Sequence, residues 1–304
     1  MSAIAERLRP PAARQGPGRM PPALLDAMEL RLARRSGGLL PGDRPAAGAG
    51  AGTELAQLRP YEVGDDVRQI DAAATARTAV PHVRLQVPER TLTTWLALDV
   101  SPSMAFGTAD RQKSDVAEGV SLAVGRLALR RAGRLAVVTF GAGSPGLVPP
   151  RGGRLATLAL RRRLETGVAQ DGEGDPEGLA GALHRLARVV RMPGLVVVVS
   201  DFRDQAAWGR PLRILAQRHD VVAVEIADPR EEERPAVGHL TLVDPETGRH
   251  VSVDTSRQAV RDRYAAGEAE RRAAVARDIG AAGVAHVRLS TDEPWLRRLA
   301  RALR

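Results

Sequence analysis

The chain has 304 residues, of which 43% are hydrophobic and 27% charged, a composition typical of a globular protein and not of a disordered or fibrous one. It has no cysteine and six scattered histidines, which argues against a disulfide framework, a thiolate metal site and a zinc site of paired histidines. The net charge of +9 invites a nucleic-acid interpretation, whereas no apolar run approaches the roughly 18 residues of a membrane span.

The residues before 80 change in character along the chain. Residues 1–21 are rich in arginine, proline and alanine, and we expect them to be disordered because they bury too little apolar surface to fold alone. Leucine and methionine then recur at helical spacing, which predicts a helix over 22–35, and a glycine-rich linker follows to residue 53. Residues 54–79, the signature segment, are dense in charged and turn-forming side chains.

From residue 80 to residue 304, strand-like and helical stretches alternate. Strands are predicted at 92–98, 134–140, 195–200, 220–226 and 285–289, and helices at 112–131, 154–164, 177–190, 206–217, 257–279 and 292–303. This alternation predicts an α/β domain with an open, mostly parallel sheet and helices on both faces. Turn-rich stretches predict two antiparallel hairpins, one at a sheet edge after residue 140 and one inserted over 239–253, projecting from the core.

Oxygen-bearing side chains follow two of the predicted strands. Asp99, Ser101 and Ser103 occupy every second position after the first strand, and Asp201 follows the valine-rich strand at 195–200. Open α/β sheets bind ligands just beyond the carboxyl ends of their strands, and hard oxygen donors suit Mg²⁺ or Mn²⁺. We therefore predict a divalent-cation site. The alternative is that the serines and Asp201 only cap the helices that follow them.

The D-x-S-x-S pattern with a later strand-ending aspartate resembles the metal-ion-dependent adhesion site (MIDAS) of von Willebrand factor type A domains. The resemblance implies a magnesium site formed by Asp99, Ser101, Ser103 and Asp201. It also implies that the cation mediates binding to another protein.

Type A domains add a threonine from a loop that should lie within 171–183 here. This stretch contains neither threonine nor serine. Asp175 or Glu177 stands near the expected place and is the candidate replacement, which would add negative charge to the site.

A second resemblance rests on residues 58–71, LRPYEVGDDVRQID, followed by Thr75-Ala76-Arg77. This pattern is similar to the signature of the bacterial domain-of-unknown-function family 58, and the likeness covers roughly residues 25–303, including the charged stretch 244–248. Proteins of this family carry a type A-like domain after the signature, and many are encoded beside MoxR-type AAA+ ATPases, which implies such an ATPase as a partner. This chain departs from the family at Ala72, where tryptophan is usual.

The signature segment has two interpretations. Its arginines and aspartates can form ion pairs in a loop that seals one edge of the sheet, or they can form a surface that a partner protein reads. The candidate partner-binding residues are Arg59, Tyr61, Asp65, Asp66, Arg68, Asp71 and Arg77. A catalytic role is disfavoured because the segment contains no visible pair of nucleophile and base.

These features predict a non-enzymatic, divalent-cation-dependent protein-interaction module that works with a MoxR-type ATPase and an unidentified client in assembling or remodelling a complex. Because no signal-like segment opens the chain, we expect it in the cytoplasm. One alternative is a metal-independent scaffold with a degenerate site.

Two further alternatives are a magnesium-dependent phosphotransfer enzyme and a nucleic-acid-binding protein. The enzyme would use Asp99 as its nucleophile, but Ser101 stands where such enzymes place an acid/base aspartate. Nucleic acid would bind arginine-rich helix faces such as 161–163, although few aromatic side chains are present to stack bases. Lysine occurs once, at Lys113, so nearly all the positive charge is arginine.

Overall fold

The computed structural model describes residues 14–28, 54–87, 92–107, 110–143, 145–175, 177–204, 206–232 and 234–302. They divide into two compact units, a small one within residues 41–91 and a large one formed by the residues on either side of it. The predictions made for residues 1–13, for the end of the helix at 22–35 and for the linker up to residue 53 lie outside the described residues.

The small unit is an antiparallel pair of strands with short helices between them. β1 (Glu54–Pro60) pairs with β2 (His82–Val87), and η1 (Val67–Gln69) and α3 (Ala72–Thr78) lie between the strands. Asp71 caps α3, since its Oδ1 accepts a hydrogen bond of 2.7 Å from the Ala74 amide. The boundary expected between residues 79 and 80 falls inside this unit, because β2 pairs with β1.

The large unit contains a six-stranded sheet in the order β10-β7-β6-β3-β4-β5. Its strands are β3 (Thr93–Asp99), β4 (Arg134–Phe140), β5 (Leu147–Gly152), β6 (Leu195–Ser200), β7 (Asp220–Ala227) and β10 (Ala285–Ser290). Every neighbouring pair is parallel except β4 and β5, which run antiparallel at one edge. The predicted open, mostly parallel sheet and its edge hairpin after residue 140 are both confirmed.

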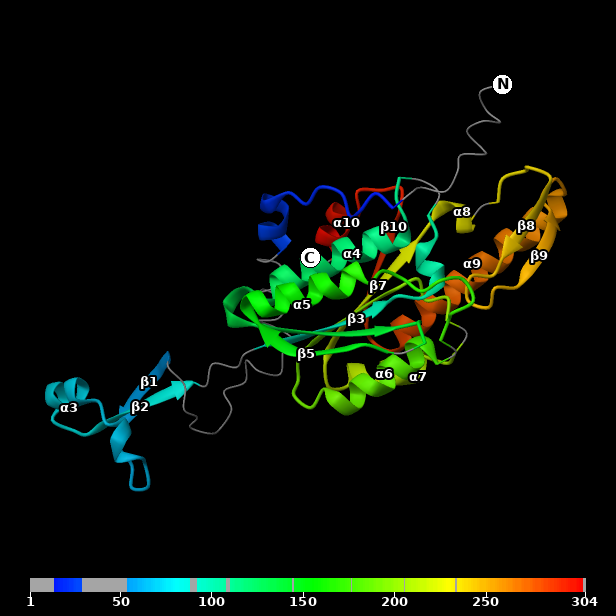
Figure 1. Ribbon diagram of the computed structural model, residues 1–304. Helices are drawn as coiled ribbons and strands as arrows, with labels where there is room; N and C mark the ends of the chain where they lie inside the picture. The colour runs from blue at the N-terminus through cyan, green and yellow to red at the C-terminus, as the bar shows by residue number, and fades with distance from the viewer. Residues whose placement is uncertain are drawn as a thin grey trace. The chain divides into compact units, whose positions relative to one another are not determined.

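Helices cover both faces of this sheet (Figure 1). One face carries α4 (Lys113–Ala128), α5 (Gly153–Glu165) and α10 (Trp295–Ala302), whereas the other carries α6 (Gly178–Val189), α7 (Gly209–Ala216) and α9 (Gln258–Ala281). Side chains of β3 alternate between the two cores: Leu96 and Leu98 pack with α4, and Trp95 and Ala97 pack on the opposite side. Both faces of the strand are buried, which explains its continuous apolar sequence.

The N-terminal segment joins the first of these cores. Residues 22–28 are helical, and Leu25 and Met28 are buried there. The amide of Gly16 donates to the Asp115 carboxylate at 3.0 Å, and the Trp295 indole N–H donates to the Pro17 carbonyl at 3.0 Å. The part of the expected disordered segment that the structure describes, residues 14–21, therefore contacts α4 and α10.

The predicted hairpin over 239–253 forms a separate two-stranded sheet. β8 (His239–Val243) pairs antiparallel with β9 (His250–Asp254), between α8 (Pro229–Glu232) and α9 in the chain. Within the described ranges, no helix combines the length and apolar character needed to cross a bilayer.

Candidate functional site

The strand order reverses between β3 and β6. The strand that follows β3 in the chain, β4, lies on one side of it, and β6 lies on the other. Ligands of open α/β sheets bind outside the carboxyl ends of the strands at such a reversal. β3 ends at Asp99, and β6 ends at Ser200 with Asp201 immediately after it, so the topology brings both predicted carboxylates to the same edge of the sheet.

Asp99 is buried and held by hydrogen bonds on both carboxylate oxygens. Its Oδ1 accepts from the Ser101 amide at 2.9 Å, and its Oδ2 accepts from the Ser200 hydroxyl at 2.5 Å. Burial, together with the nearby negative charge of Asp201, raises the pKa of Asp99 from 3.8 to about 7. The surroundings of Asp99 therefore disfavour its charged form.

The two serines of the motif turn their hydroxyls toward each other. Ser101 Oγ and Ser103 Oγ are 3.1 Å apart, and both side chains are buried. Ser101 precedes the 3-10 helix η2 (Pro102–Ala105) without capping it through its side chain, and the N-cap of α4 is Gln112. Ser101 occupies the N-cap position of η2, but its hydroxyl makes no capping hydrogen bond and is instead grouped with that of Ser103 at the end of β3.

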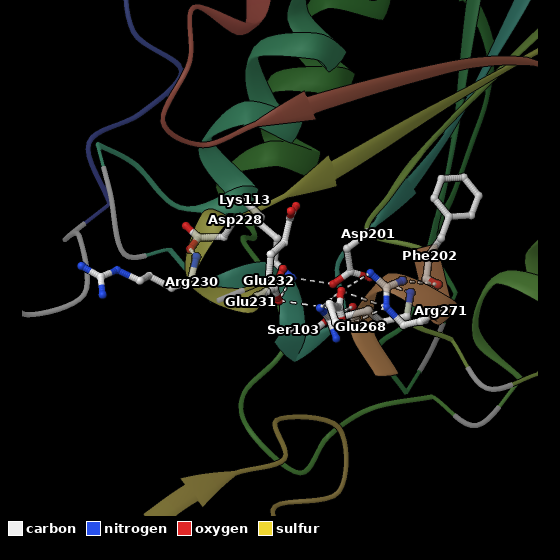
Figure 2. Close-up of polar contacts among 12 residues, drawn as sticks. Ser103, Lys113, Asp201, Phe202, Asp228, Arg230, Glu231, Glu232, Glu268 and Arg271 are labelled. Atoms are coloured by element: carbon white, nitrogen blue, oxygen red, sulfur yellow. Dashed lines mark hydrogen bonds and ion pairs between the residues drawn. The ribbon is translucent and has the colours of Figure 1, made fainter. Parts of the chain in front are cut away.

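Asp201 carries an internal counter-ion that sequence reasoning missed. The ammonium of Lys113, at the start of α4, lies 2.6 Å from Asp201 Oδ2 and 2.7 Å from Glu231 Oε1, and Lys113 is fully buried (Figure 2). Burial alone would lower the pKa of Lys113, but the charges of Asp201 and Glu231 outweigh it and raise that pKa. Burial would likewise raise the pKa of Asp201, yet Lys113 dominates and lowers it.

The charged groups continue away from the site toward α9. Arg203 lies 3.2 Å from Glu231 and 2.8 Å from Glu268. Glu268 also binds Arg271 at 2.7 Å (Figure 2). Burial tends to raise the pKa of Glu268, but the two arginines more than compensate and lower it. These ion pairs connect Asp201 with α8, just before the β8–β9 hairpin, and with α9, just after it.

The turn between β8 and β9, residues 244–249, reaches the same edge of the sheet. We call it the hairpin tip. The Ser103 amide donates to Glu246 Oε1 at 3.1 Å, and the Gly172 amide donates to the Pro245 carbonyl at 2.7 Å. Burial raises the pKa of Glu246, with a further contribution from the charge of Asp201. The hairpin was predicted to project from the core, but its tip returns to the predicted metal site.

Neither candidate for the missing threonine contacts the carboxylates of the site in the described part of the chain. Asp175 Oδ1 accepts a hydrogen bond of 3.0 Å from the amide of Glu177, and Glu177 is exposed. The same loop instead lies against the hairpin tip, since a Cβ added at Gly174 would lie 2.4 Å from Glu246 Oε2. Glu246 is thus the additional carboxylate that the fold brings to the site.

The donor set fits a hard divalent cation. No three histidine, cysteine or acidic side chains form a metal cage among the described residues, so a cation here would also need the hydroxyls of Ser101 and Ser103. The Asp99 carboxylate is buried, and its hydrogen-bond donors, the Ser101 amide and the Ser200 hydroxyl, are neutral. Asp201 is already paired with Lys113, but each carboxylate oxygen has two lone pairs and can accept another partner.

The candidate partner residues of the signature segment lie in the small unit. Arg59 pairs with Asp65 at 2.7 Å, as predicted, whereas Asp71 pairs with Arg84 at 2.6 Å. The Asp66 carboxylate accepts from the amide of Arg68. Tyr61 is half-buried and Arg77 is exposed on the last turn of α3. The contacts found for this segment are internal to the small unit and do not by themselves define a binding surface.

Residues 57–274 match the family described as "Protein of unknown function DUF58". An uncharacterized protein of Mycobacterium tuberculosis is 39% identical over 281 residues, covering 92% of this chain and 87% of that protein. An uncharacterized protein of Mycobacterium avium is 38% identical over 162 residues, covering 51% of this chain and 90% of that protein.

The solved structures that match this chain do so at low sequence identity and with low TM-scores. The conserved hypothetical protein BatB from Bacteroides thetaiotaomicron has 15% identity and a TM-score of 0.41, covering 70% of this chain and 97% of that one. An aerotolerance-related membrane protein from Bacteroides fragilis has 13% identity and a TM-score of 0.43, covering 70% and 98%. Similarity at this level carries no information about function.

Proposed function

The chain belongs to the DUF58 family of proteins of unknown function, and we propose that it is a non-enzymatic protein-interaction module whose site binds Mg²⁺ or Mn²⁺. Asp99, Ser101, Ser103 and Asp201 would hold the cation. When bound, it would supply a coordination position for an acidic side chain of a partner, because Mg²⁺ retains exchangeable waters. The main support is the convergence of these four residues at the strand-order reversal between β3 and β6.

The charge on Asp99 favours a cation over a purely structural role. Its carboxylate is buried, its pKa is raised to about 7, and it accepts hydrogen bonds from the Ser101 amide and the Ser200 hydroxyl, which are both neutral. A cation beside Asp99 would offset both its burial and the charge of Asp201. We propose a cytoplasmic MoxR-type AAA+ ATPase as the partner, on the basis of the family resemblance.

A binding experiment with a purified MoxR-type ATPase from the same organism tests this proposal. We expect the parent chain to bind it and Asp99→Ala to lose most of the affinity, while Glu270→Ala, an exposed acidic residue on α9, binds like the parent. The test compares variants and does not remove the cation with a chelator, because a chelator would also remove magnesium from the nucleotide bound to the ATPase. Equal binding by the parent and Asp99→Ala would contradict the proposal.

A metal-independent scaffold is the second candidate, and the Lys113 ammonium favours it. Lys113 already neutralises Asp201, so part of the charge that a cation would balance is balanced within the chain. A phosphotransfer role for Asp99 receives less support, since both of its oxygens are held and Ser101 provides no acid of suitable pKa. Several arginines form ion pairs within the large unit, among them Arg203, Arg271 and Arg288, which weakens the nucleic-acid alternative.

A further inference from the structure

We propose that the hairpin tip is an intrachain ligand of the cation site, with the Glu246 carboxylate standing where the acidic side chain of a partner would bind. The partner must then displace the tip. This inference rests on the proposed function and adds to it a form of regulation: the site is covered by its own chain until a competing carboxylate arrives.

The tip is attached to the site from two sides. Ser103, a member of the motif, donates its amide to Glu246 Oε1 at 3.1 Å, although 143 residues separate the two in sequence. On the other side, the Gly172 amide donates to the Pro245 carbonyl at 2.7 Å. Gly172 and Gly174 lie in the loop from which type A domains take their threonine, so the tip spans from one expected ligand loop to the other.

The absence of a side chain at Gly174 is what admits the tip. A Cβ at Gly174 would lie 2.4 Å from Glu246 Oε2, closer than real Cβ contacts, and 3.0 Å from the Glu246 carbonyl oxygen, which is also tight. Any other residue at position 174 would therefore push Glu246 away. Gly174 thus leaves room for the Glu246 carboxylate in this loop.

The side chain of Glu246 is the kind of group that the proposed cation site would bind. A carboxylate is the hard oxygen donor that Mg²⁺ and Mn²⁺ prefer, and an incoming partner would offer the same group. Glu246 Oε1 lies 3.1 Å from the Ser103 amide, next to the proposed cation ligands. A cation held by Asp99, Ser101, Ser103 and Asp201 would attract this carboxylate and fix the tip, so the cation and the tip should stabilise each other.

The hairpin is also suited to being displaced. Its two strands pair only with each other in the described structure, and an isolated two-stranded hairpin is marginally stable. The elements on either side of it in the chain, α8 and α9, are connected to Asp201 through Glu231 and Glu268. Release of the tip can therefore occur while its flanking elements stay anchored.

Amide hydrogen exchange of residues 239–254, measured by mass spectrometry with and without Mn²⁺, tests the inference. Glu246→Ala removes the acceptor for the Ser103 amide and should speed exchange at the tip about tenfold without metal. Glu246→Gln keeps an acceptor oxygen but not the charge, so its tip should exchange like the parent's without metal and lose the slowing that Mn²⁺ causes in the parent. Glu270→Gln, on the exposed face of α9, is the matched control and should behave as the parent.

A peptide experiment tests displacement directly. A variant in which an Asn-Gly turn replaces residues 244–249 should bind a synthetic peptide of residues 242–251 in a Mn²⁺-dependent manner. The parent should bind that peptide about tenfold more weakly, because its own tip competes, and a peptide with glutamine at the Glu246 position should not bind.

The outcomes separate this inference from the proposed function. If Mn²⁺ binds the parent but protects the tip equally in Glu246→Gln, or if both peptides bind alike, the inference is overturned while the cation site stands. If Mn²⁺ does not bind the parent, the proposed function fails and the inference fails with it. Loss of Mn²⁺ protection in Glu246→Gln together with glutamate-dependent peptide binding supports the inference.

Discussion

Lys113 provides a stringent test of the charge arrangement at the site. Replacing it with methionine keeps a flexible chain of similar bulk but leaves Asp201 and Glu231 without the ammonium that lies 2.6 and 2.7 Å from them. Because Lys113 is fully buried, water cannot take its place at no cost. Removing one member of a buried ion pair typically costs about 3 to 5 kcal/mol of unfolding free energy.

For a unit of this size, that loss corresponds to a fall of about 6 to 20 °C in melting temperature, at about 2 to 4 °C per kcal/mol. Chemical denaturation followed by circular dichroism measures the loss of unfolding free energy, and thermal denaturation measures the fall in melting temperature. Arg161→Met is the matched control, since Arg161 lies on an exposed face of α5 and its loss should change stability by about 0.5 kcal/mol or less.

A second substitution tests whether the unpaired carboxylates cause the loss of stability. Adding Asp201→Asn to Lys113→Met removes one of the two carboxylate charges left unpaired, so the double variant should recover part of the lost stability. If Lys113→Met costs no more than Arg161→Met, the buried ammonium between Asp201 and Glu231 does not exist in solution, and the reasoning about the charge of the site is wrong.

Two further predictions concern Asp99 and Trp208. The folded pKa of Asp99, about 7, lies above its unfolded value of 3.8, so the folded state binds a proton more tightly between these values, and this group makes stability fall as the pH rises from about 4 to about 7. Asp99→Asn should remove that slope from urea titrations at several pH values, and an unchanged slope would refute the assignment. Trp208 is buried and packs edge-to-face on Phe202 with ring centroids 5.2 Å apart, so Trp208→Ala should cost about 3 to 5 kcal/mol in urea titrations, whereas a loss below about 1 kcal/mol would place the indole at the surface.

Periodicity predicted the large unit well because its elements are strongly patterned. The run of valines in β6 is buried on both faces, and the alternation of strands and helices from β3 onward leaves few other architectures. The signature segment was harder, since polar and charged residues interrupt the apolar pattern of its strands. Nothing in its composition indicates that β2 pairs with β1 instead of beginning the large sheet.

The grouping of Asp99 and Asp201 could be predicted because both follow strands of one parallel sheet. Lys113 and Glu246 could not, because their contacts span 88 and 143 residues and depend on how α4 and the hairpin pack. The sequence nevertheless contains one unusual feature at each of these two residues. Lys113 is the single lysine of an arginine-rich chain, and the hairpin tip carries a glutamate where a simple turn needs none.

Calorimetric titration of the parent and of Asp99→Ala with Mn²⁺ tests the central claim most directly. We expect the parent to bind Mn²⁺ and Asp99→Ala to bind about 100-fold more weakly or not at all, since even outer partners of a metal contribute up to that factor. At about 100 times the dissociation constant, the cation should also stabilise the parent by about 2.7 kcal/mol. Equal titrations of the two proteins would contradict the claim that Asp99 belongs to a cation site.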